Sequence, residues 1–485
     1  MAPSARSDQR APLPVALVLL LCLLAALPAA AGAQARPLQV RDGRLVDGQG
    51  RQVVLHGVNV VFKRAPYLPA GGGGEQLSFT DRDVRRLRGW GMNTIRLGIT
   101  WKAVMPRPGV VDDRYLDRLV ATARRATRHG LYVLLDMHQD LYAEPFQGNG
   151  APEWAIRNDG LPFVDQGPFP FDYLAPAVGR AFTSFWADRD RIRTRFVRSW
   201  TAIARRFVGQ PRIVGYDLFN EPACEVQAPP CGLPPRPAAA GALLQPFYDA
   251  LIPAVRRADP THPVFYEDWI TTDFGFPFSV GLPPNRRWPY PGQGLSYHVY
   301  CGQPLRPEPC PQQEEEALRN AVAAARRNRV APLLTEFGAT DDLAVLGRLV
   351  DLADRFGQGW QYWSYKTYDD PTTQASSGPG GADAQSIVAA DGAVKAAKLR
   401  LLARAYPRRI AGTGARWSFV PESGRFALEY RPRGLEHTEI VLPAVHYAGG
   451  AVVRVRGGNA HRGRGVVRVR PAPGVRRVTV TARPR

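Results

Sequence analysis

Two patterns of hydrophobic and polar positions divide the chain. From about residue 53 to residue 366, short apolar runs rich in β-branched residues alternate with longer segments of helical periodicity. The short runs are almost continuously apolar, which is typical of strands covered on both faces in a parallel sheet. After about Tyr406, apolar and polar residues alternate with a period of two between Gly and Pro turns. That pattern predicts antiparallel strands.

The first region contains eight strand candidates with helical runs between most of them. This alternation predicts a (β/α)8 TIM barrel, and the second region predicts a small C-terminal all-β sandwich. We place the barrel domain at residues 36–406 and the sandwich at 407–485. The strand candidates are 53–61, 93–99, 131–138, 213–220, 263–268, 294–300, 332–338 and 359–366. The helical runs are 81–90, 112–129, 191–208, 241–258, 313–328 and 341–356.

One connection in the barrel region is unusually long. About 50 residues rich in Phe, Pro, Gly and Trp separate His138 from the helix near Arg191, and loops of this length are usually functional. The tract "FDYLAPAVGRAFTSFWAD" (171–188) is strongly apolar. It predicts either core packing or a lid that contacts a lipid.

The first 35 residues have the organisation of a signal peptide. Arg6 and Arg10 precede the apolar run "LPVALVLLLCLLAAL", and the small residues "PAAAGAQA" follow it. The run is short for a membrane span, although a signal anchor is the alternative. We predict cleavage near Ala33 or Ala35 and export of the mature protein.

Cysteine usage agrees with export. Cys22 lies in the predicted signal peptide, and the other four cysteines form two close pairs in Pro-rich segments. An even number in an exported chain indicates disulfides, and four cysteines allow three connectivities. We expect pairing within each loop, Cys224 with Cys231 and Cys301 with Cys310.

The charge balance adds a possible surface interaction. The 485 residues carry a formal net charge of +20, but no zinc-finger, RRM or KH signature accompanies it, so we expect no nucleic-acid partner. From Ala411 to Arg485 there are 14 Arg and 4 Glu. This excess is either a solvated sheet face or a surface for peripheral contact with anionic membranes or glycolipid aggregates.

Candidate chemistry gathers at the ends of the strand candidates. In a parallel barrel the reactive side chains lie at the carboxyl ends of the strands. Most strand candidates end in a polar or aromatic residue, and His298 and Tyr300 share one face of theirs. The set is Arg96, Asp136, His138, Asp140, Asn220, Glu221, His298, Tyr300, Glu336 and Trp363.

Two carboxylates in this set predict a reaction. Glu221 and Glu336 each follow an apolar strand directly, in "DLFNEP" and "LLTEFG". Glycoside hydrolysis uses such a pair, one protonated to assist the leaving group and one ionised to attack the anomeric carbon. Different environments or mutual repulsion separate the two pKa values. A single Glu could be a helix cap or an ion-pair partner, but the pair favours a hydrolase.

Several motifs together resemble a known family. The segments "LFNEP", "LLTEFG", "TIRLG", "SYHVY" and "YWSYK" resemble glycoside hydrolase family 5, the cellulase-like enzymes of clan A. Within it, "VVLHGVNVVFKRAPY", "LLDMHQDLYAEPFQGNGAPEWA" and "YWSYKTYDDP" look like the endoglycoceramidase branch. The resemblance covers roughly residues 45–405 and extends to a C-terminal β-module.

The resemblance implies catalytic roles for four residues. Glu221 would be the acid/base and Glu336 the nucleophile. Asn220 would hold the sugar 2-hydroxyl, and Arg96 would orient Glu336 and keep it ionised.

The resemblance also implies a set of substrate-binding side chains around the two glutamates. An aromatic face among them would stack on the sugar ring, and polar groups would bind sugar hydroxyls. They are Lys63, His138 and Asp140 for hydroxyls, His298 and Tyr300 beside the glutamates, and Trp363 for stacking.

Structural roles are the alternatives. Arg96 could be only a barrel ion pair, Trp363 and the two histidines could be ordinary core residues, and Arg64 competes with Lys63 as the binding cation. Asp136 fits support of the site better than contact with substrate.

We therefore expect a secreted, monomeric, retaining glycoside hydrolase. Its substrate would be a glycosphingolipid, cleaved by double displacement at the β-glycosidic bond between the oligosaccharide, or galactose, and ceramide. The reaction needs no metal and no cofactor. The alternatives are a soluble β-glucanase or β-glycosidase of the same family, or a non-catalytic glycan- or lipid-binding barrel, which would not need both glutamates.

Overall fold

The computed structural model describes Met1 and residues 36–485, except 168, 229–230, 233–236, 279–291, 303–305, 369, 371 and 373–380. The predicted signal peptide lies outside the described residues. The chain divides into two units, Met1–Ala35 and Arg36–Arg485. The second unit holds the predicted barrel and the C-terminal strands.

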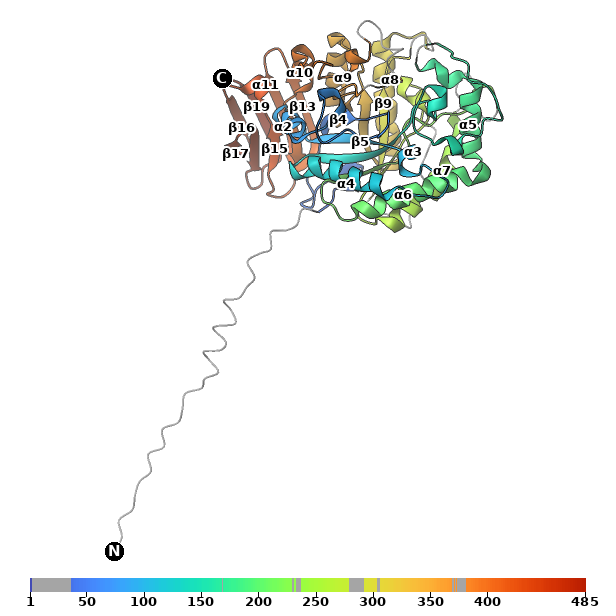
Figure 1. Cartoon of the computed structure of the whole chain (residues 1–485). Coiled ribbons are helices and arrows are strands. Elements are labelled where there is room, and N and C mark those ends of the chain that lie inside the picture. Colours follow the sequence, from blue (N-terminus) through green and yellow to red (C-terminus); the bar gives the residue numbers. More distant parts are fainter. Residues whose placement is uncertain are drawn as a thin grey trace. The chain divides into compact units, whose positions relative to one another are not determined.

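Eight parallel strands close into a barrel. Figure 1 labels β4, β5 and β9 among them. Neighbouring strands follow the chain order, with β10 and β11 completing the ring beside β4, which is the topology of a TIM barrel. The predicted fold class is confirmed. The strands are β4 (His56–Val60), β5 (Thr94–Thr100), β6 (Tyr132–His138), β7 (Ile213–Asp217), β8 (Val264–Tyr266), β9 (Gln293–Val299), β10 (Ala331–Phe337) and β11 (Trp360–Tyr362).

The helices between the strands begin and end where the sequence provides caps. Thr80 and Asp83 form a capping box at the start of one helix, and Asp112 and Asp342 cap two others. Gly357 ends a helix in the left-handed conformation that glycine favours. The helices of the barrel region are α2 (Asp81–Gly89), α3 (Trp101–Val104), α4 (Asp113–Arg128), α5 (Pro176–Trp186), α6 (Ile192–Phe207), α7 (Pro237–Ala258), α8 (Cys310–Asn328), α9 (Leu343–Phe356) and α10 (Ala396–Leu402).

The long insertion after β6 folds around helix α5, which lies on the right of Figure 1. Phe185 and Trp186 on this helix are buried, and their rings pack 5.4 Å from Phe196 of α6 and Phe247 of α7 respectively. Both also contact Phe219, two residues before Glu221. The apolar tract is therefore core packing that supports the backbone beside Glu221.

The C-terminal region forms two antiparallel sheets, on the left of Figure 1. One of them also contains the N-terminal strands, because β3 pairs with β12. The expected boundary between Tyr406 and Pro407 therefore does not separate this module from the N-terminal end of the chain. The seven-stranded sheet has the order β1 (Gln39–Arg41), β2 (Arg44–Val46), β3 (Gln52–Val53), β12 (Tyr406–Ile410), β15 (Thr438–Val441), β18 (Val466–Pro471) and β17 (Gly458–Gly463). The four-stranded sheet has the order β13 (Gly412–Val420), β14 (Arg425–Pro432), β19 (Val478–Pro484) and β16 (Ala451–Arg456).

Polar contacts fasten this module to helix α9. The indole N–H of Trp417 in β13 donates to Asp354 Oδ1 at 2.8 Å, and Arg404 pairs with Asp354 Oδ2 at 2.6 Å. All three side chains are buried. The barrel and the sheets therefore share part of their interior.

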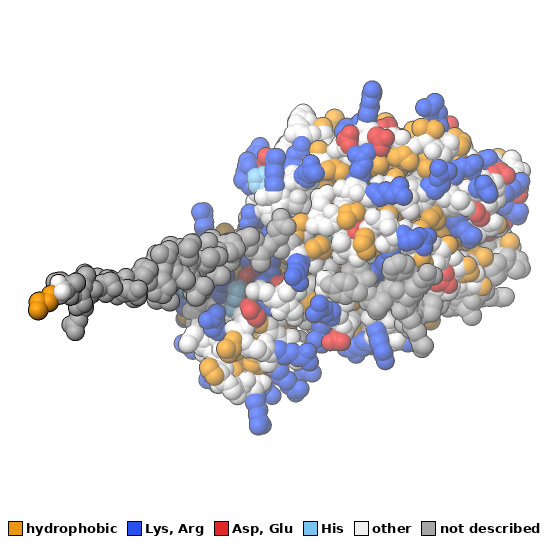
Figure 2. Space-filling view, turned by 90° about the horizontal axis from the view of Figure 1, so that it is seen from below, with side chains coloured by type: hydrophobic (Ala, Val, Ile, Leu, Met, Phe, Trp, Pro, Cys, Tyr) orange, Lys and Arg blue, Asp and Glu red, His pale blue; other side chains and the backbone are white. Residues whose placement is uncertain are grey.

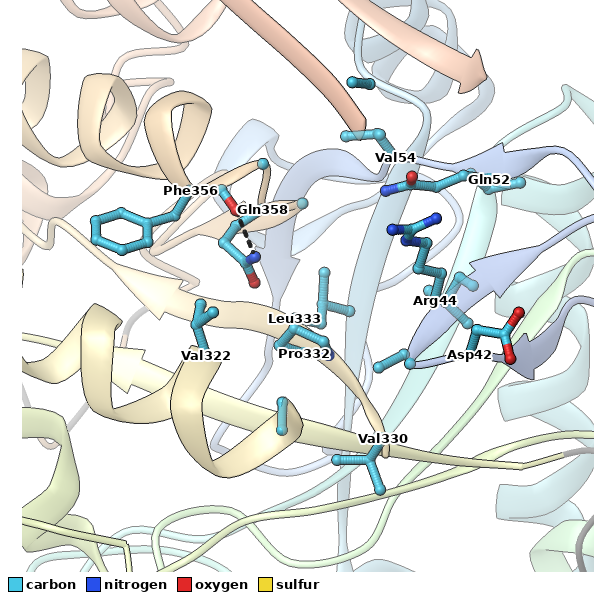
Figure 3. Close-up of a pocket in the computed structure, with 18 of the residues that line it drawn as sticks. Asp42, Arg44, Gln52, Val54, Val322, Val330, Pro332, Leu333, Phe356 and Gln358 are labelled. Atoms are coloured by element: carbon cyan, nitrogen blue, oxygen red, sulfur yellow. Dashed lines mark hydrogen bonds between the residues drawn. The ribbon is translucent and has the colours of Figure 1, made fainter. Parts of the chain in front are cut away.

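A cavity of about 630 Å³ lies at the amino ends of the barrel strands, beside the C-terminal sheets (Figure 3). Arg44 and Asp42 approach it from β2 and the turn before it, and Gln358 lies on the other side, where its amide donates to the carbonyl of Phe356. This end of a barrel is opposite the rim that carries active sites.

Basic side chains are spread over the surface. Figure 2 shows Lys and Arg across the visible face, with fewer Asp and Glu among them. Within the part of the chain that the structure describes, none of the helices combines the length and the apolar character that a membrane crossing requires.

Candidate active site

Glu221 lies beyond the end of β7, in an unusual backbone conformation. The strand ends at Asp217, so the prediction that it runs to Asn220 is wrong. The three residues that follow stay in line with the barrel because Leu218 and Asn220 donate to carbonyls of Phe265 and Met137. Glu221 then adopts a φ of 44°, a left-handed value that is uncommon for a non-glycine residue.

Glu336 is held by two donors at the carboxyl end of β10. Arg96 Nη1 lies 2.5 Å from its Oε1, and the hydroxyl of Tyr300 donates to its Oε2 at 3.1 Å. All three side chains come from strands or strand ends, because Arg96 belongs to β5 and Tyr300 follows β9. A carboxylate with two fixed donors presents its oxygens in one orientation.

Arg96 is the centre of a buried charge network. Its guanidinium is fully buried and also lies close to three other carboxylates, those of Asp136 at 3.0 Å, Asp217 at 2.9 Å and Glu267 at 3.1 Å. Burial alone would lower the pKa of Arg96, but these carboxylates raise it well above its ordinary value. Arg96 also donates to Asn220 Oδ1 at 2.8 Å, which aims the amide beside Glu221.

Glu221 is prepared to carry a proton. Burial raises the pKa of its carboxyl to about 7, although the hydrogen bond with His298, at 2.9 Å, favours the ionised form. Its other oxygen, Oε2, is buried and has no hydrogen-bond partner among the described residues. This oxygen therefore lacks a protein donor in the part of the chain that the structure describes, and the group can be protonated in weakly acidic solution.

A second cluster joins the first through Asp136. The ring of His138 contacts Asp136 Oδ2 at 2.8 Å through Nδ1 and faces Asp140 Oδ2 at 3.3 Å through Nε2. Burial would lower the pKa of His138, but the two carboxylates raise it to about 9. Trp363 stacks on this ring with centroids 5.3 Å apart.

Lys63, and not Arg64, points into this cluster. The Lys63 side chain is buried, whereas Arg64 is exposed. Lys63 Nζ lies 2.8 Å from Asp140 Oδ2, 2.9 Å from Asp370 Oδ2 and 4.7 Å from the centre of the Trp363 ring. Burial opposes its charge, but Asp140 and Asp370 raise the pKa of Lys63 above its ordinary value.

All ten predicted catalytic and binding residues thus lie in one connected network. Sequence reasoning missed Glu267, which accepts the backbone N–H of Glu221, and Asp273, whose carboxyl lies 3.6 Å from His298. Glu267 directly follows β8, so the rule that finds rim residues at strand ends applies to it. Asp273 lies in a 3₁₀ turn, Ile270–Phe274, where no strand pattern points to it.

The predicted disulfides are confirmed. Cys224 pairs with Cys231, and Cys301 pairs with Cys310. The first begins three residues after Glu221 and the second begins directly after Tyr300. Each disulfide therefore begins in the chain that leaves the rim beside a predicted site residue.

One group of residues has the spacing of a metal site. Glu221, Asp273 and His298 offer ligand atoms within 4.8 Å of one another. Burial would lower the pKa of His298, but Glu267, Glu336 and Asp273 raise it well above the ordinary value. A protonated imidazole has no lone pair for a metal, so the group suits acid–base chemistry.

Comparison with known proteins agrees with this chemistry. The family model "Cellulase (glycosyl hydrolase family 5)" matches residues 46–369, and "Glycoside hydrolase family 5 C-terminal domain" matches residues 404–481. Endoglycoceramidase I of Rhodococcus hoagii (strain 103S) is 34% identical over 462 residues, which cover 92% of this chain and 86% of the relative. Endoglycoceramidase of Hydra vulgaris is 30% identical over 421 residues, 80% of this chain and 76% of the relative.

A solved structure matches over nearly its whole length. The lactosyl-enzyme intermediate of Endo-glycoceramidase II from Rhodococcus sp. superposes with a TM-score of 0.75 at 28% identity, covering 91% of this chain and 99% of that one. The barrel with a rim of paired carboxylates is an O-glycosyl hydrolase. The chain belongs to glycoside hydrolase family 5.

Proposed function

We propose that the protein cleaves the β-glycosidic bond between the glycan and ceramide of glycosphingolipids, with retention of anomeric configuration. The observation that carries the chemistry is the pair Glu221 and Glu336, whose carboxyl groups both face His298 Nδ1. The lipid aglycone is supported by the relatives named above, which are endoglycoceramidases. A solved relative holds ganglioside GM3.

The spacing of the two carboxyls supports retention. His298 Nδ1 lies 2.9 Å from Glu221 Oε1 and 3.8 Å from Glu336 Oε2. These oxygens are therefore at most about 6.7 Å apart. Retaining enzymes place their carboxyls about 5–5.5 Å apart, and inverting enzymes place them about 6.5–9.5 Å apart to admit water between them. The limit admits the retaining distance and excludes nearly all of the inverting range.

In the first step, Glu336 attacks the anomeric carbon while Glu221 gives its proton to the departing ceramide oxygen. The C–O bond to ceramide breaks and an ester to Glu336 forms. In the second step, Glu221, now ionised, takes a proton from water. The water oxygen attacks the anomeric carbon, and the bond from this carbon to Glu336 breaks. Glu221 ends protonated and Glu336 ends ionised, so the cycle needs no added co-reactant.

The remaining side chains have binding roles in this proposal. Asn220, already fixed by Arg96, holds the sugar 2-hydroxyl, and Tyr300 stays beside the nucleophile. His138, Asp140 and Lys63 offer hydrogen bonds to further hydroxyls on the same side of the rim. The Trp363 indole N–H donates to Gln385 Oε1 at 2.7 Å, which fixes the orientation of the ring proposed to stack on a sugar.

The direct test of the substrate is product analysis. The protein should release ceramide from a fluorescent ganglioside or from galactosylceramide, and the comparison of the two gives the glycan preference. Glu336→Gln should abolish release while binding persists. Faster cleavage of cello-oligosaccharides than of either glycolipid would contradict the lipid assignment and favour a β-glucanase.

We further propose that the protein is exported as a monomer and meets glycolipids at a membrane or aggregate surface. The sequence of residues 1–35 supports export, and exposed arginines on the C-terminal sheets, such as Arg454, Arg456 and Arg483, support surface contact. Cosedimentation with anionic vesicles, but not with neutral ones, is the expected result. Light scattering should give the mass of one chain, and the secreted protein should begin near residue 34 or 36.

A further inference from the structure

A third carboxylate, Glu267, lies between the two proposed catalytic glutamates. It directly follows β8 and is 3% exposed. One of its oxygens, Oε2, accepts the backbone N–H of Glu221 at 2.7 Å. The other, Oε1, accepts from Arg96 Nη2 at 3.1 Å and faces His298 Nε2 at 3.3 Å.

We propose that Glu267 is a positioning residue for the acid/base: it holds the Glu221 backbone in place and keeps the charged His298 ring turned toward the Glu221 carboxyl. This inference rests on the proposed role of Glu221. Glu267 touches neither the expected sugar nor the leaving oxygen in this scheme. It acts through Glu221 and His298.

The backbone of Glu221 needs such a support. A left-handed φ for a non-glycine residue costs about 1–3 kcal/mol and persists where surrounding contacts fix it. The bond from the Glu221 N–H to Glu267 fixes the residue itself. A second hydrogen bond, from the Ile270 N–H to the carbonyl of Pro222 at 3.0 Å, also joins the segment after β8 to the segment after β7. The chain after β8 therefore holds the chain after β7.

Glu267 is itself fixed from several directions. The Ser296 hydroxyl lies 3.1 Å from its Oε1. The Tyr248 hydroxyl donates to the Glu267 carbonyl at 2.7 Å and accepts from the Glu267 N–H at 3.2 Å. Burial opposes ionisation, but His298 and Arg96 hold the pKa of Glu267 below its ordinary value. Glu267 is therefore a rigid anion.

This anion controls the charge on His298. The ring lies between Glu267 on its Nε2 side and Glu221 on its Nδ1 side, and Asp273 and Glu336 face Nδ1 at 3.6 and 3.8 Å. A doubly protonated ring donates to Glu221 through Nδ1, whereas its Nε2 side makes an ionic contact with Glu267 and no hydrogen bond. That donation stabilises the Glu221 carboxylate, which the second half-reaction needs as its base.

Two further carboxylates belong to the same electrostatic environment. Asp136 of β6 and Asp217 of β7 contact the guanidinium that Glu267 shares. Both are on the Arg96 side of Glu267. Two of the carboxylates near this guanidinium also face His298: Glu336 on the Nδ1 side and Glu267 on the Nε2 side. Glu336 is the proposed nucleophile, so substitutions at Glu267 are the ones that test the link between the two halves of the network.

Glu267→Gln keeps the shape and removes the charge. We expect kcat/KM for lactosylceramide to fall about 10²-fold, because the acid/base is displaced. Without the Glu267 charge, His298 loses its proton more readily. A neutral His298 stabilises the ionised form of Glu221 less, so the pKa of Glu221 rises. The basic limb of the pH profile should then move to higher pH. Dinitrophenyl β-lactoside, whose leaving group needs no proton, should lose much less kcat/KM.

Two control variants separate charge from position and from stability. Glu267→Asp keeps the charge but withdraws the carboxyl, so kcat/KM should fall with the basic limb unmoved. Glu314→Gln removes another buried carboxylate, which pairs with Arg348 at 2.6 Å on the outer helices, and should lower the melting temperature without moving the limb.

The proposal is overturned if Glu267→Gln leaves the basic limb in place and lowers kcat/KM equally for both substrates, which is the result of general structural damage. If that variant does not fold, wild-type kcat/KM in Glu267→Asp overturns the positioning role. A wrong assignment of Glu221 as the acid/base is recognised separately. In that case Glu221→Ala would lower kcat/KM by the same factor for lactosylceramide and for dinitrophenyl β-lactoside.

Discussion

At the scale of single residues, the structure separates two chemically identical side chains. Glu221 is buried beside His298, with one oxygen that has no partner among the described residues, and Glu336 accepts from Arg96 and Tyr300. In the proposed mechanism, Glu221 gives and takes the proton and Glu336 attacks. Such a separation by environment is how paired carboxylates divide acid and nucleophile roles.

The pKa of about 7 at Glu221 predicts the alkaline limit of activity. Glu221 must be protonated and Glu336 ionised in the first step, so kcat/KM for a glycolipid should reach a plateau just below this value, where both conditions hold. It should fall about tenfold per pH unit above it, because the acid is lost. Initial rates across the pH range measure the limb. A profile that is flat to pH 9 would contradict the assignment.

Replacing Glu221 should divide substrates by their leaving group. Glu221→Ala should lower kcat/KM for lactosylceramide by roughly 10³-fold, because the ceramide alkoxide needs a proton. Dinitrophenyl β-lactoside should keep most of its kcat/KM, and azide should accelerate its turnover by replacing water in the second step. Equal losses on the two substrates would show that Glu221 is not the acid.

At the scale of elements, the sequence predicted the barrel well because periodicity and caps are local. Each expected helix lies within a few residues of an observed one, and the rim rule found ten residues of the network. Glu267 escaped notice because the strand candidate 263–268 extends past it, whereas the observed strand β8 ends at Tyr266 and leaves Glu267 at the rim. The end of β7 was predicted too late because the apolar pattern continues through Leu218 and Phe219. These residues lie beyond Asp217, the last residue of the strand.

Long-range pairings could not be predicted in this way. The pairing of β3 with β12 joins residues that are more than 350 positions apart, and no periodicity within either strand specifies the partner. The contacts among Glu221, Glu267 and His298 also join residues that are far apart in the sequence. The sequence places each at a strand end, but the order of strands around the barrel brings them together.

The buried ion pair between α9 and the residues before β12 predicts a large stability effect. Arg404→Ala leaves Asp354 buried without its cation, which costs about 3–5 kcal/mol. Asp351, which also pairs with Arg404, is mostly exposed, so Asp351→Ala should cost less than about 1 kcal/mol. Denaturant unfolding measures both. Similar losses for the two variants would contradict the role of burial.

At the scale of the whole molecule, the barrel and the C-terminal sheets form a shared structure within residues 36–485. The N-terminal strands pair with β12, and Trp417 and Arg404 reach into helix α9. The module therefore contributes to the stability of the barrel.

Truncation tests this dependence. A chain that ends at residue 406 removes nearly all of β12 and exposes the edge of β3, so we expect insoluble or inactive protein. Calorimetry of the full chain should show one unfolding transition. A soluble, active fragment 36–406, or two separate transitions, would contradict the shared core.

The central claim is that Glu221 and Glu336 carry out a retaining cleavage of glycolipid. The most direct measurement is proton NMR of the sugar that first appears when the protein acts on lactosylceramide, before the anomers equilibrate. Two displacements predict that the β-anomer of lactose appears first. First appearance of the α-anomer, or no lactose at all, would contradict the account.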